Sequence, residues 1–399
     1  MRWVRALKEI SNNQAGAIVI GGDYQGLGIV QSLGRHGIPV CIVDDEHSIA
    51  KFSRYATYAV KLADVRDERA TVDALLDVCR RLGLKGWVLY PTRDETVAAL
   101  SRHRRLLTEY FRVPTPEWTT IRCVWDKRNT YRLAEELGIP VPRTWYPANV
   151  TDLRSIDADF PVAIKPAIKE HFFYATRAKA WRASGRAELE SLFLRAAKLV
   201  GPGEVMIQEL VPGDGRQQFA YCAFFKQGHA VGSMVVRRTR QHPPEFGRAS
   251  TFVETTEIPL LETLSKRFLC AIDYYGLVEL EYKLDPRDGQ YKLLDVNART
   301  WGYHTLGRHA GVDFPYLLFA DQLGHRAEQQ RGRPGVSWIR LVTDLPTGIS
   351  EIVAGNLSWR PYLRSLRAAH VEAVFSREDP LPGIAELALI PYLSVRRGF

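Results

Sequence analysis

Short apolar runs alternate with amphipathic segments over residues 1–115. Strands are predicted at residues 17–20, 40–43, 58–61 and 87–90. The runs at 17–20 and 87–90 are apolar throughout, which is typical of buried strands in sheets covered on both faces. Between the last two runs, apolar residues recur at the i, i+3, i+4, i+7 spacing of a helix that ends at Gly83. Thr92 and Glu95 have the spacing of a capping box for the next helix. This alternation predicts a doubly wound parallel sheet in a Rossmann-like N-terminal domain.

The pattern changes after the proline-rich residues 113–116. A helix is predicted to begin at Asp126 and to stop at Gly138, and short strands of alternating polar and apolar residues follow it. Residues 277–297 have the pattern of a β-hairpin with turn chemistry in the middle. The expected fold class is therefore α/β, followed by α+β. Residues 331–399 are mixed and basic, and the sequence indicates no role for them.

Polar side chains line one face of each strand in this hairpin. Glu279 and Glu281 alternate with apolar residues, as do Asp295 and Asn297, so each pair shares a face. Carboxylates gathered on a mostly apolar hairpin repel one another unless a cation neutralises them, and an all-oxygen set suits Mg²⁺ bridging to phosphates. Arg299 lies one alternation further, where it can contact a phosphate. A solvated sheet face with surface ion pairs is the alternative interpretation.

Two lysines and a glycine-rich turn supply groups that bind anions. Lys165 ends an apolar strand and needs a partner such as phosphate. Lys127 stands at a helix N-terminus, where a positive charge does not stabilise the helix. The turn at residues 21–28 opens a helix, and Asp44 ends the next strand near the ribose-binding distance of dinucleotide sites. An anionic substrate, NAD and simple helix packing are all consistent with the turn.

Composition excludes several classes of protein. The 399 residues include 54 Lys and Arg against 45 Asp and Glu, and the net charge of +9 favours anionic partners. Five scattered cysteines exclude a disulfide scaffold and a Cys-x-x-Cys zinc site, and they fit a reducing compartment. Without a membrane-spanning run or a signal peptide, we expect a cytoplasmic protein. Nucleic acid is not an expected partner, because no aromatic residues interleave the basic strand at residues 236–240.

Five short motifs then follow one another along the chain: Asp126-Lys127, Gly138-Ile-Pro-Val-Pro142, Phe160-Pro-Val-Ala-Ile-Lys-Pro166, Ile207-Gln-Glu-Leu-Val-Pro-Gly213 and Leu293-Leu-Asp-Val-Asn-Ala-Arg299. In this order and spacing they resemble the ATP-grasp superfamily over residues 16–325, and in particular its ADP-forming carboxylate–amine ligases. The resemblance implies an ATP-grasp domain at residues 116–330 after the N-terminal domain 1–115, and a C-terminal extension at 331–399. Within the ATP-grasp domain it implies a linker helix at 116–140, a lid subdomain at about 141–211 and a metal and phosphate subdomain at about 212–330.

The resemblance also implies roles for residues at matching positions. Those expected to bind ATP are Lys127 and Lys165 at the phosphates, Gln208, Glu209 and Val211 at the adenine, and either Asp214 or Gln217 at the ribose. Those expected to bind Mg²⁺, or Mn²⁺, are Asp295, Asn297 and Glu281, with Glu279 as the alternative to Glu281. Arg299 matches an arginine of the family pattern and is expected to be catalytic.

The sequence departs from the family pattern after the second lysine. Residues 167–179 contain no glycine where relatives have a glycine-rich phosphate loop. We expect Lys169, Arg177 or Lys179 to contact phosphate through side chains, with aromatic residues anchoring the loop as a lid. In addition, Asp295 stands where the family has Glu, and Ala298 where it has Pro.

The substrates are expected between the N-terminal domain and the ATP site. Gly22 and Asp23 of the glycine-rich turn are candidate substrate contacts. On the basic strand, Arg238 is a candidate catalytic residue and Arg240 a further substrate contact. A surface basic strand is the alternative for both arginines.

The sequence thus predicts an ATP-dependent ligase with the cofactors ATP and Mg²⁺. A carboxylate would attack the γ-phosphorus of ATP to give an acyl phosphate and ADP, and an amine would then displace phosphate to form an amide. The expected partners are a small-molecule carboxylate and amine, with a homodimer as a further expectation. The alternatives are an ATP-grasp phosphotransferase of the kinase type and a dinucleotide-binding oxidoreductase or sensor.

Overall fold

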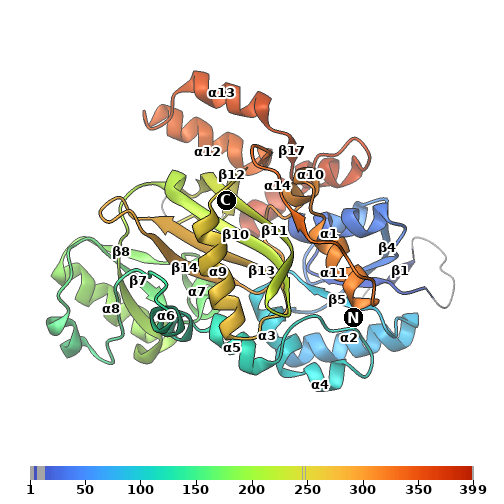
Figure 1. The fold of residues 1–399 in the computed structure, drawn as a ribbon, viewed down its shortest axis with the longest axis horizontal. Coiled ribbons are helices and arrows are strands. Elements are labelled where there is room, and N and C mark those ends of the chain that lie inside the picture. Colours follow the sequence, from blue (N-terminus) through green and yellow to red (C-terminus); the bar gives the residue numbers. More distant parts are fainter. Residues whose placement is uncertain (1–3, 7–13, 245, 248, 398–399) are drawn as a thin grey trace.

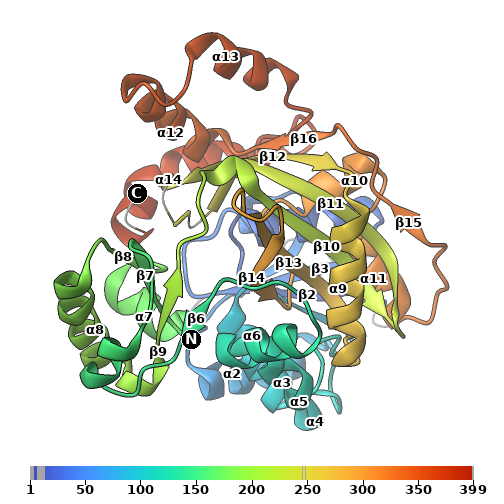
Figure 2. The same cartoon turned by 60° about the vertical axis from the view of Figure 1, so that its left-hand side comes forward.

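The described part of the chain forms three β-sheets, which follow one another in sequence, and helices accompany each of them (Figure 1). The computed structural model describes residues 4–6, 14–244, 246–247 and 249–397. Figure 2 shows the same arrangement from a second side, with helix α8 (Arg186–Val200) and the sheet beside it set apart from the other two sheets. In the described part of the chain, no helix combines the length and apolar character needed to cross a membrane.

The first sheet has the strand order β1-β4-β3-β2-β5. Its strands are β1 (Val4–Ala6), β2 (Ala17–Ile20), β3 (Val40–Asp44), β4 (Ala56–Lys61) and β5 (Val88–Pro91), and its helical elements are α1 (Tyr24–Arg35), η1 (Ala50–Phe52), α2 (Glu68–Leu82), α3 (Asp94–Arg102) and α4 (Arg104–Leu107). β2 to β5 are parallel, as predicted, whereas β1 joins β4 antiparallel. The fully apolar run of β2 has a physical cause: Val19 packs in one core with Leu27 of α1, and Ile18 in another with Leu75 of α2.

The second sheet is small and entirely antiparallel, in the order β6-β9-β7-β8. It consists of β6 (Thr144–Trp145), β7 (Val162–Pro166), β8 (Trp181–Ala183) and β9 (Val205–Glu209), with the helical elements η2 (Val150–Ser155), α7 (Lys169–Thr176), α8 (Arg186–Val200) and η3 (Pro202–Glu204). Two helices precede it, α5 (Trp118–Trp125) and α6 (Lys127–Glu136). The glycine-free segment expected to be a loop is instead mostly the helix α7, which begins four residues after Lys165.

The third sheet carries the predicted hairpin. Its strands are β10 (Gln218–Lys226), β11 (His229–His242), β12 (Ala249–Thr256), β13 (Gly276–Leu284), β14 (Tyr291–Asn297), β15 (Gln330–Arg331), β16 (Ser337–Ile339) and β17 (Val371–Glu372), in the order β14-β13-β10-β11-β12-β16-β17 with β15 beside β11. Its other elements are η4 (Gly215–Gln217), α9 (Pro259–Ala271), α10 (Thr305–Ala310) and α11 (Phe314–Gln322). β13 and β14 pair antiparallel, which confirms the hairpin.

The C-terminal residues complete this sheet and then leave it. β16 and β17 extend the sheet, and α12 (Leu341–Val353), α13 (Trp359–Ala368) and α14 (Leu381–Arg397) surround them. Figures 1 and 2 show α12 and α13 as a helical hairpin that stands out from the body at one end. One core joins the N-terminal helix α1 to the large sheet, since Leu27 and Val236 belong to it together with Trp301 and Phe314.

Candidate functional site

The β13–β14 hairpin brings the four predicted polar side chains together. Its register sets Glu279 opposite Asn297 and Glu281 opposite Asp295. Asn297 Nδ2 donates two hydrogen bonds of 3.0 Å, one to Glu279 Oε2 and one to Glu281 Oε1. The prediction that these side chains face one site is confirmed. The alternative of a solvated sheet face is wrong, because Glu279 and Asn297 are buried.

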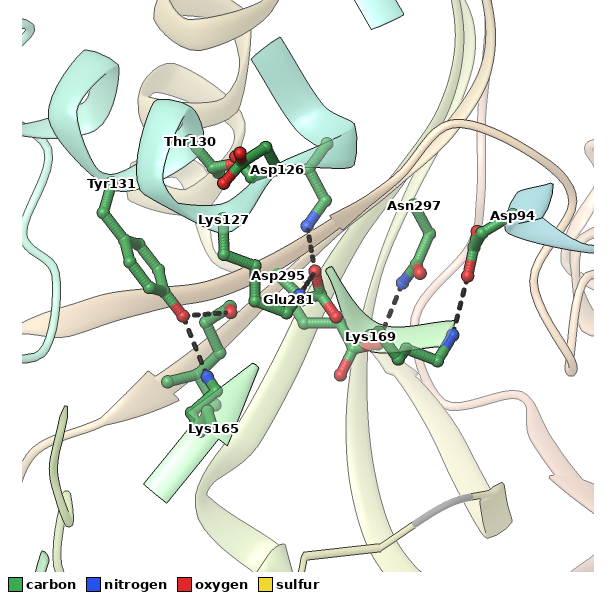
Figure 3. Close-up of polar contacts among 12 residues, drawn as sticks. Asp94, Asp126, Lys127, Thr130, Tyr131, Lys165, Lys169, Glu281, Asp295 and Asn297 are labelled. Atoms are coloured by element: carbon green, nitrogen blue, oxygen red, sulfur yellow. Dashed lines mark hydrogen bonds and ion pairs between the residues drawn. The ribbon is translucent and has the colours of Figure 1, made fainter. Parts of the chain in front are cut away.

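Cations from two other elements bind these carboxylates. Arg238 on β11 donates to Glu281 Oε2 at 3.0 Å, across the intervening strand β10. Lys127, in the first turn of α6, donates to Asp295 Oδ1 (Figure 3). The helix begins at this point because the Asp126 carboxylate caps it. Lys127 therefore has an anionic partner. The sequence indicated such a partner, because a positive charge at a helix N-terminus is otherwise unfavourable.

The charges within this cluster depend on one another. Burial, reinforced by the neighbouring Glu281 charge, raises the pKa of Glu279. Burial also opposes ionisation of Glu281, but Arg238, Lys179 and Lys127 hold its pKa well below its ordinary value. Glu281 is thus the ionised glutamate that faces the cations.

Lys165 lies beside Tyr131, which is one helical turn after Lys127 on the same face of α6. It leaves β7 and donates from Nζ to Tyr131 Oη at 2.9 Å and to Gln208 Oε1 at 3.0 Å. Gln208 in turn donates to Thr144 Oγ1 at 2.9 Å. Figure 3 shows Lys165, Tyr131 and Lys127 pointing toward the same space from a strand and a helix. Both hydrogen-bond partners of Lys165, Tyr131 and Gln208, are neutral, so neither compensates its positive charge.

Lys179 is a third ammonium group beside the cluster. It is half-buried, and burial lowers its pKa to about 8 although the Glu281 charge opposes this. Within the described residues, no hydrogen-bond partner of its Nζ is found, in contrast to Lys127 and Lys169. Removing an ammonium group from water without a hydrogen bond to replace the lost hydration costs free energy, and an anionic ligand would offset that cost.

Asp94, the first residue of α3, joins the N-terminal sheet to this cluster. Arg299 donates to its two carboxylate oxygens at 2.6 and 3.0 Å, and Lys169 donates to Oδ2 at 2.6 Å. Arg299 also donates to Asn297 Oδ1 at 3.2 Å, which links Asp94 to the hairpin. Although burial alone would raise it, the two cations hold the pKa of Asp94 well below its usual range.

A pocket opens where these groups meet. Its polar lining comes from Asp94, Lys127, Lys169, Glu170, Asp295 and Asn297, and its apolar lining from Val97, Ile121, Val124, Trp125, Val296 and Ala298. The helices α3, α5, α6 and α7 therefore surround one polar centre at the end of the hairpin strand β14.

We compared the sequence and the fold of this chain with those of known proteins. No family profile matches the chain. It is 23% identical to the D-aspartate ligase of Enterococcus faecium (strain Aus0004), over 73% of this chain and 73% of that protein. Its fold is similar to that of an L-amino acid ligase from Bacillus licheniformis, with a TM-score of 0.60 and 18% identity over 78% of this chain and 74% of that one.

A third similar structure is the biotin carboxylase domain of the 2-oxoglutarate carboxylase of Hydrogenobacter thermophilus, in complex with MgADP, ADP and bicarbonate. Its TM-score is 0.64, with 15% identity over 82% of this chain and 74% of that one. The chain has the ATP-grasp fold. The resemblance drawn from the five motifs is therefore confirmed.

The expected ATP-grasp hinge follows β9 and is held by cations. Lys283 donates to the Val211 carbonyl at 2.8 Å and to the Gly213 carbonyl at 2.7 Å. Glu209 accepts hydrogen bonds of 2.9 Å from Arg287 and from Lys292. These contacts hold the segment between the second and third sheets in place through its backbone carbonyls and through the Glu209 side chain.

The ribose candidates lie in the following turn. Asp214 caps η4 and pairs with Arg216 at 2.6 and 2.8 Å, and about half of its side chain is exposed. The Gln217 Oε1 atom is buried and has no hydrogen-bond partner among the described residues. The structure thus leaves Gln217 with the unused acceptor and Asp214 with a local partner.

The glycine-rich turn packs against the ATP-grasp module. Gly21 has φ +98°, and a Cβ there would lie 2.1 Å from Thr92 Oγ1, so only glycine fits. Asp23 caps α1, and Gln25 of the same turn donates to the Thr300 carbonyl at 3.4 Å. The turn therefore lies beside the segment that follows Arg299.

The same region argues against the dinucleotide alternative. Asp44, expected to meet a ribose, is buried and accepts hydrogen bonds from the Gly22 N–H at 2.7 Å and from Arg93. The predicted capping box is also wrong, because Arg93 is the N-cap of α3 and Thr92 donates to the Ile20 carbonyl instead.

Two arginines lie away from the cluster. Arg240 donates to both oxygens of the buried Asp344 at 2.8 and 2.9 Å, and its guanidinium stacks on Tyr362. Arg240 therefore anchors the C-terminal helices, which argues against the expected substrate contact. Arg177 is the exposed C-cap of α7 in a left-handed conformation.

Three residues at the site escape sequence reasoning. These are Asp94, Tyr131 and Tyr303, none of which the sequence motifs indicate. Tyr303 donates to Glu279, and Tyr131 receives a hydrogen bond from Lys165. Their partners lie 205, 34 and 24 positions away in sequence, so no local pattern carries the signal.

Proposed function

We propose that this protein is an ATP-dependent carboxylate–amine ligase that releases ADP and phosphate. The observation that carries the proposal is the convergence of Lys127, Lys179 and Arg299 on a hairpin bearing Glu281, Asp295 and Asn297. Lys165 lies beside them, where it donates to Tyr131 of α6. Such a ring of cations around a small set of oxygen donors suits a nucleotide triphosphate with a divalent cation. The D-aspartate ligase and L-amino acid ligase relatives support an amino acid as one substrate.

In the proposed reaction, a carboxylate oxygen attacks the γ-phosphorus and the bond to the ADP oxygen breaks. The amine nitrogen then attacks the acyl carbon, the bond from that carbon to the phosphate oxygen breaks, and the amine loses a proton. We assign Lys127, Lys165 and Lys179 to the phosphates, and Arg299 and Arg238 to charge that develops during transfer. The protein acts by positioning and neutralising charge, since no nucleophilic residue is required.

The oxygen donors of the hairpin are the candidate ligands of a divalent cation. Among the described residues, no three Asp, Glu, His or Cys side chains are close enough to hold an ion together. The set instead combines Glu281 and Asp295 with the Asn297 amide, and the two carboxylates face Arg238 and Lys127. Hard oxygen donors fit Mg²⁺, and Mn²⁺ by the same chemistry. When bound, such a cation supplies neutralisation of phosphate charge.

We further propose that Gln208, Glu209 and Val211 contact the adenine, and Asp214 or Gln217 the ribose. Gly22 and Asp23 are proposed on the substrate side, because their turn lies beside Thr300. We also propose that the chain divides into domains at residues 1–115, 116–330 and 331–399, and that the first of these is doubly wound.

The test is ADP release with Mg²⁺ over pools of amino acids and small carboxylates. The ligase proposal predicts release that requires both a carboxylate and an amine. Release with a single substrate, together with a phosphorylated product, would instead establish a phosphotransferase. Binding of NADPH, followed by its fluorescence, would favour the dinucleotide alternative.

A further inference from the structure

The C-terminal helix α12 has its polar residues turned inward. Its buried positions include Thr343, Asp344 and Thr347. Asp344 is held by the bidentate contact from Arg240, and Thr347 Oγ1 lies 2.9 Å from His242 Nδ1. These polar contacts fix which face of the helix meets the protein body. The arrangement is the reverse of an ordinary surface helix, which buries its apolar stripe.

The opposite face of α12 is apolar and open. Leu345, Ile349 and Val353 recur every four residues, and 40%, 58% and 84% of their surfaces are exposed. Since i and i+4 positions lie above one another, the three side chains form a continuous aliphatic stripe. Contiguous exposed apolar surface of this kind marks an interaction site.

The neighbouring helix α13 adds charge to this surface. Trp359 and Leu363 are exposed and one turn apart, so they share a face. Arg360, Arg364 and Arg367 are also exposed, and residues 357–369 contain no Asp or Glu. On a helical projection, the arginines fall on the sector next to Trp359 and Leu363. The two helices approach closely, because a Cβ at Gly348 would lie 2.4 Å from the Tyr362 ring.

From this surface, named here the C-terminal patch (Leu345, Ile349, Val353, Trp359, Leu363, Arg360, Arg364 and Arg367), we infer that the protein docks on an anionic lipid surface. On α13, Trp359 and Leu363 with arginines in the neighbouring sector have the pattern of a helix that lies in the membrane interface. The aliphatic stripe of α12, which packs against α13, adds exposed apolar surface. The absence of acids in residues 357–369 supplies the charge complementarity to anionic headgroups. The hairpin stands out from the body in both views, which leaves the patch accessible (Figures 1 and 2).

The test is co-sedimentation of the full chain with vesicles of phosphatidylglycerol and phosphatidylcholine, against phosphatidylcholine alone. We expect binding to the anionic vesicles that weakens as salt rises. The triple variant Arg360→Gln/Arg364→Gln/Arg367→Gln should weaken it roughly a hundredfold, at about fivefold for each arginine. Ile349→Ser/Trp359→Ser should also reduce it.

Matched controls are Arg69→Gln on α2 and Leu199→Ser on α8, which remove an exposed arginine and an exposed leucine elsewhere. They should bind as wild type does, and the melting temperature of each variant reports its fold. Equal binding to both kinds of vesicle, no binding, or binding unaffected by the patch variants would overturn the inference. A dimer that Ile349→Ser/Trp359→Ser dissociates, without vesicle binding, would assign the patch to a second copy of this chain.

Discussion

At the residue scale, the site is a balance between carboxylates and the cations that hold them. Asp295 is the clearest example, because it faces Lys127 directly and accepts a further hydrogen bond of 3.0 Å from the Val296 N–H. A short-range pattern of period two was enough to predict that Glu279 and Glu281 share a face of one strand, and that Asp295 and Asn297 share a face of the other. The cations that face Asp295 and Glu281 come from α6 and β11. The approach of these two elements to the hairpin depends on tertiary packing, which a local sequence pattern does not predict.

We predict that Asp295→Asn lowers ADP release by more than about a hundredfold while the protein stays folded. The substitution keeps the shape but removes the charge that a divalent cation needs. Steady-state kinetics and the melting temperature measure the two effects. Asp288→Asn, on the exposed turn of the same hairpin, is the matched control. Near-wild-type turnover in folded Asp295→Asn would remove the metal assignment.

At the element scale, α7 shows where sequence reasoning reached its limit. The sequence showed that residues 167–179 lack glycine, but the prediction that they form a loop was wrong, because most of them form α7. The helix instead bridges to the N-terminal sheet, since Lys169 pairs with Asp94 and Tyr174 donates to Glu95. The predicted packing role of an aromatic residue holds for Phe172, which is buried against Trp181. Partners so distant in sequence cannot be read from a local pattern.

The two lysines of this segment should therefore behave differently. Lys179→Ala is expected to lower kcat/KM for ATP by about ten- to a hundredfold and to leave the melting temperature nearly unchanged, since its ammonium has no hydrogen bond or ion pair among the described residues. Lys169→Ala should also lower the melting temperature, because it removes the ion pair to Asp94. Kinetics and thermal unfolding of both variants decide this. A Lys179→Ala protein within about twofold of wild type would contradict the phosphate role.

The hairpin turn offers a test of stability. Asp285 is buried and accepts hydrogen bonds from Arg287, and it pairs with Lys292 at 2.7 Å. These partners, Arg287 foremost, hold the pKa of Asp285 well below its ordinary value. A carboxylate with a lowered folded-state pKa stabilises the protein above its unfolded pKa of about 3.9 and loses that effect as the pH falls.

Asp285→Asn should accordingly lower the free energy of unfolding by about 1–3 kcal/mol at neutral pH. The difference from wild type should shrink as the pH falls below about 4. Urea unfolding of both proteins across this range gives the comparison. A difference that does not change with pH would show that the charge contributes nothing.

At the scale of the whole molecule, the order of motifs predicted more than any single residue did. Each motif is short, but four of the five mark elements that the fold brings to one place, α6, β7, β9 and β14, and the fifth follows the end of α6. The N-terminal sheet and the hairpin were both predicted because buried strands and turns have local signals. The C-terminal strands β16 and β17 were not, since they are only three and two residues long and depend on the sheet they join.

Nucleotide choice is a property of this assembled site. We predict that ATP with Mg²⁺ raises the melting temperature of the protein and that GTP does so far less, because ligands stabilise the state that binds them. The proposed hinge contacts at residues 208–211 come from an extended segment that can read the amino edge of adenine. Thermal shift assays with the two nucleotides provide the comparison. Equal shifts would contradict the adenine assignment.

The central claim, ligation through an acyl phosphate, is tested most directly by following oxygen. The amino acid or carboxylate identified by ADP release is labelled with oxygen-18 in its carboxylate and allowed to react with ATP and the amine. The proposed mechanism predicts that label is transferred to the released phosphate, because the carboxylate oxygen that attacks phosphorus leaves with it. Amide formation with unlabelled phosphate, or a phosphorylated substrate without an amide, would contradict the account.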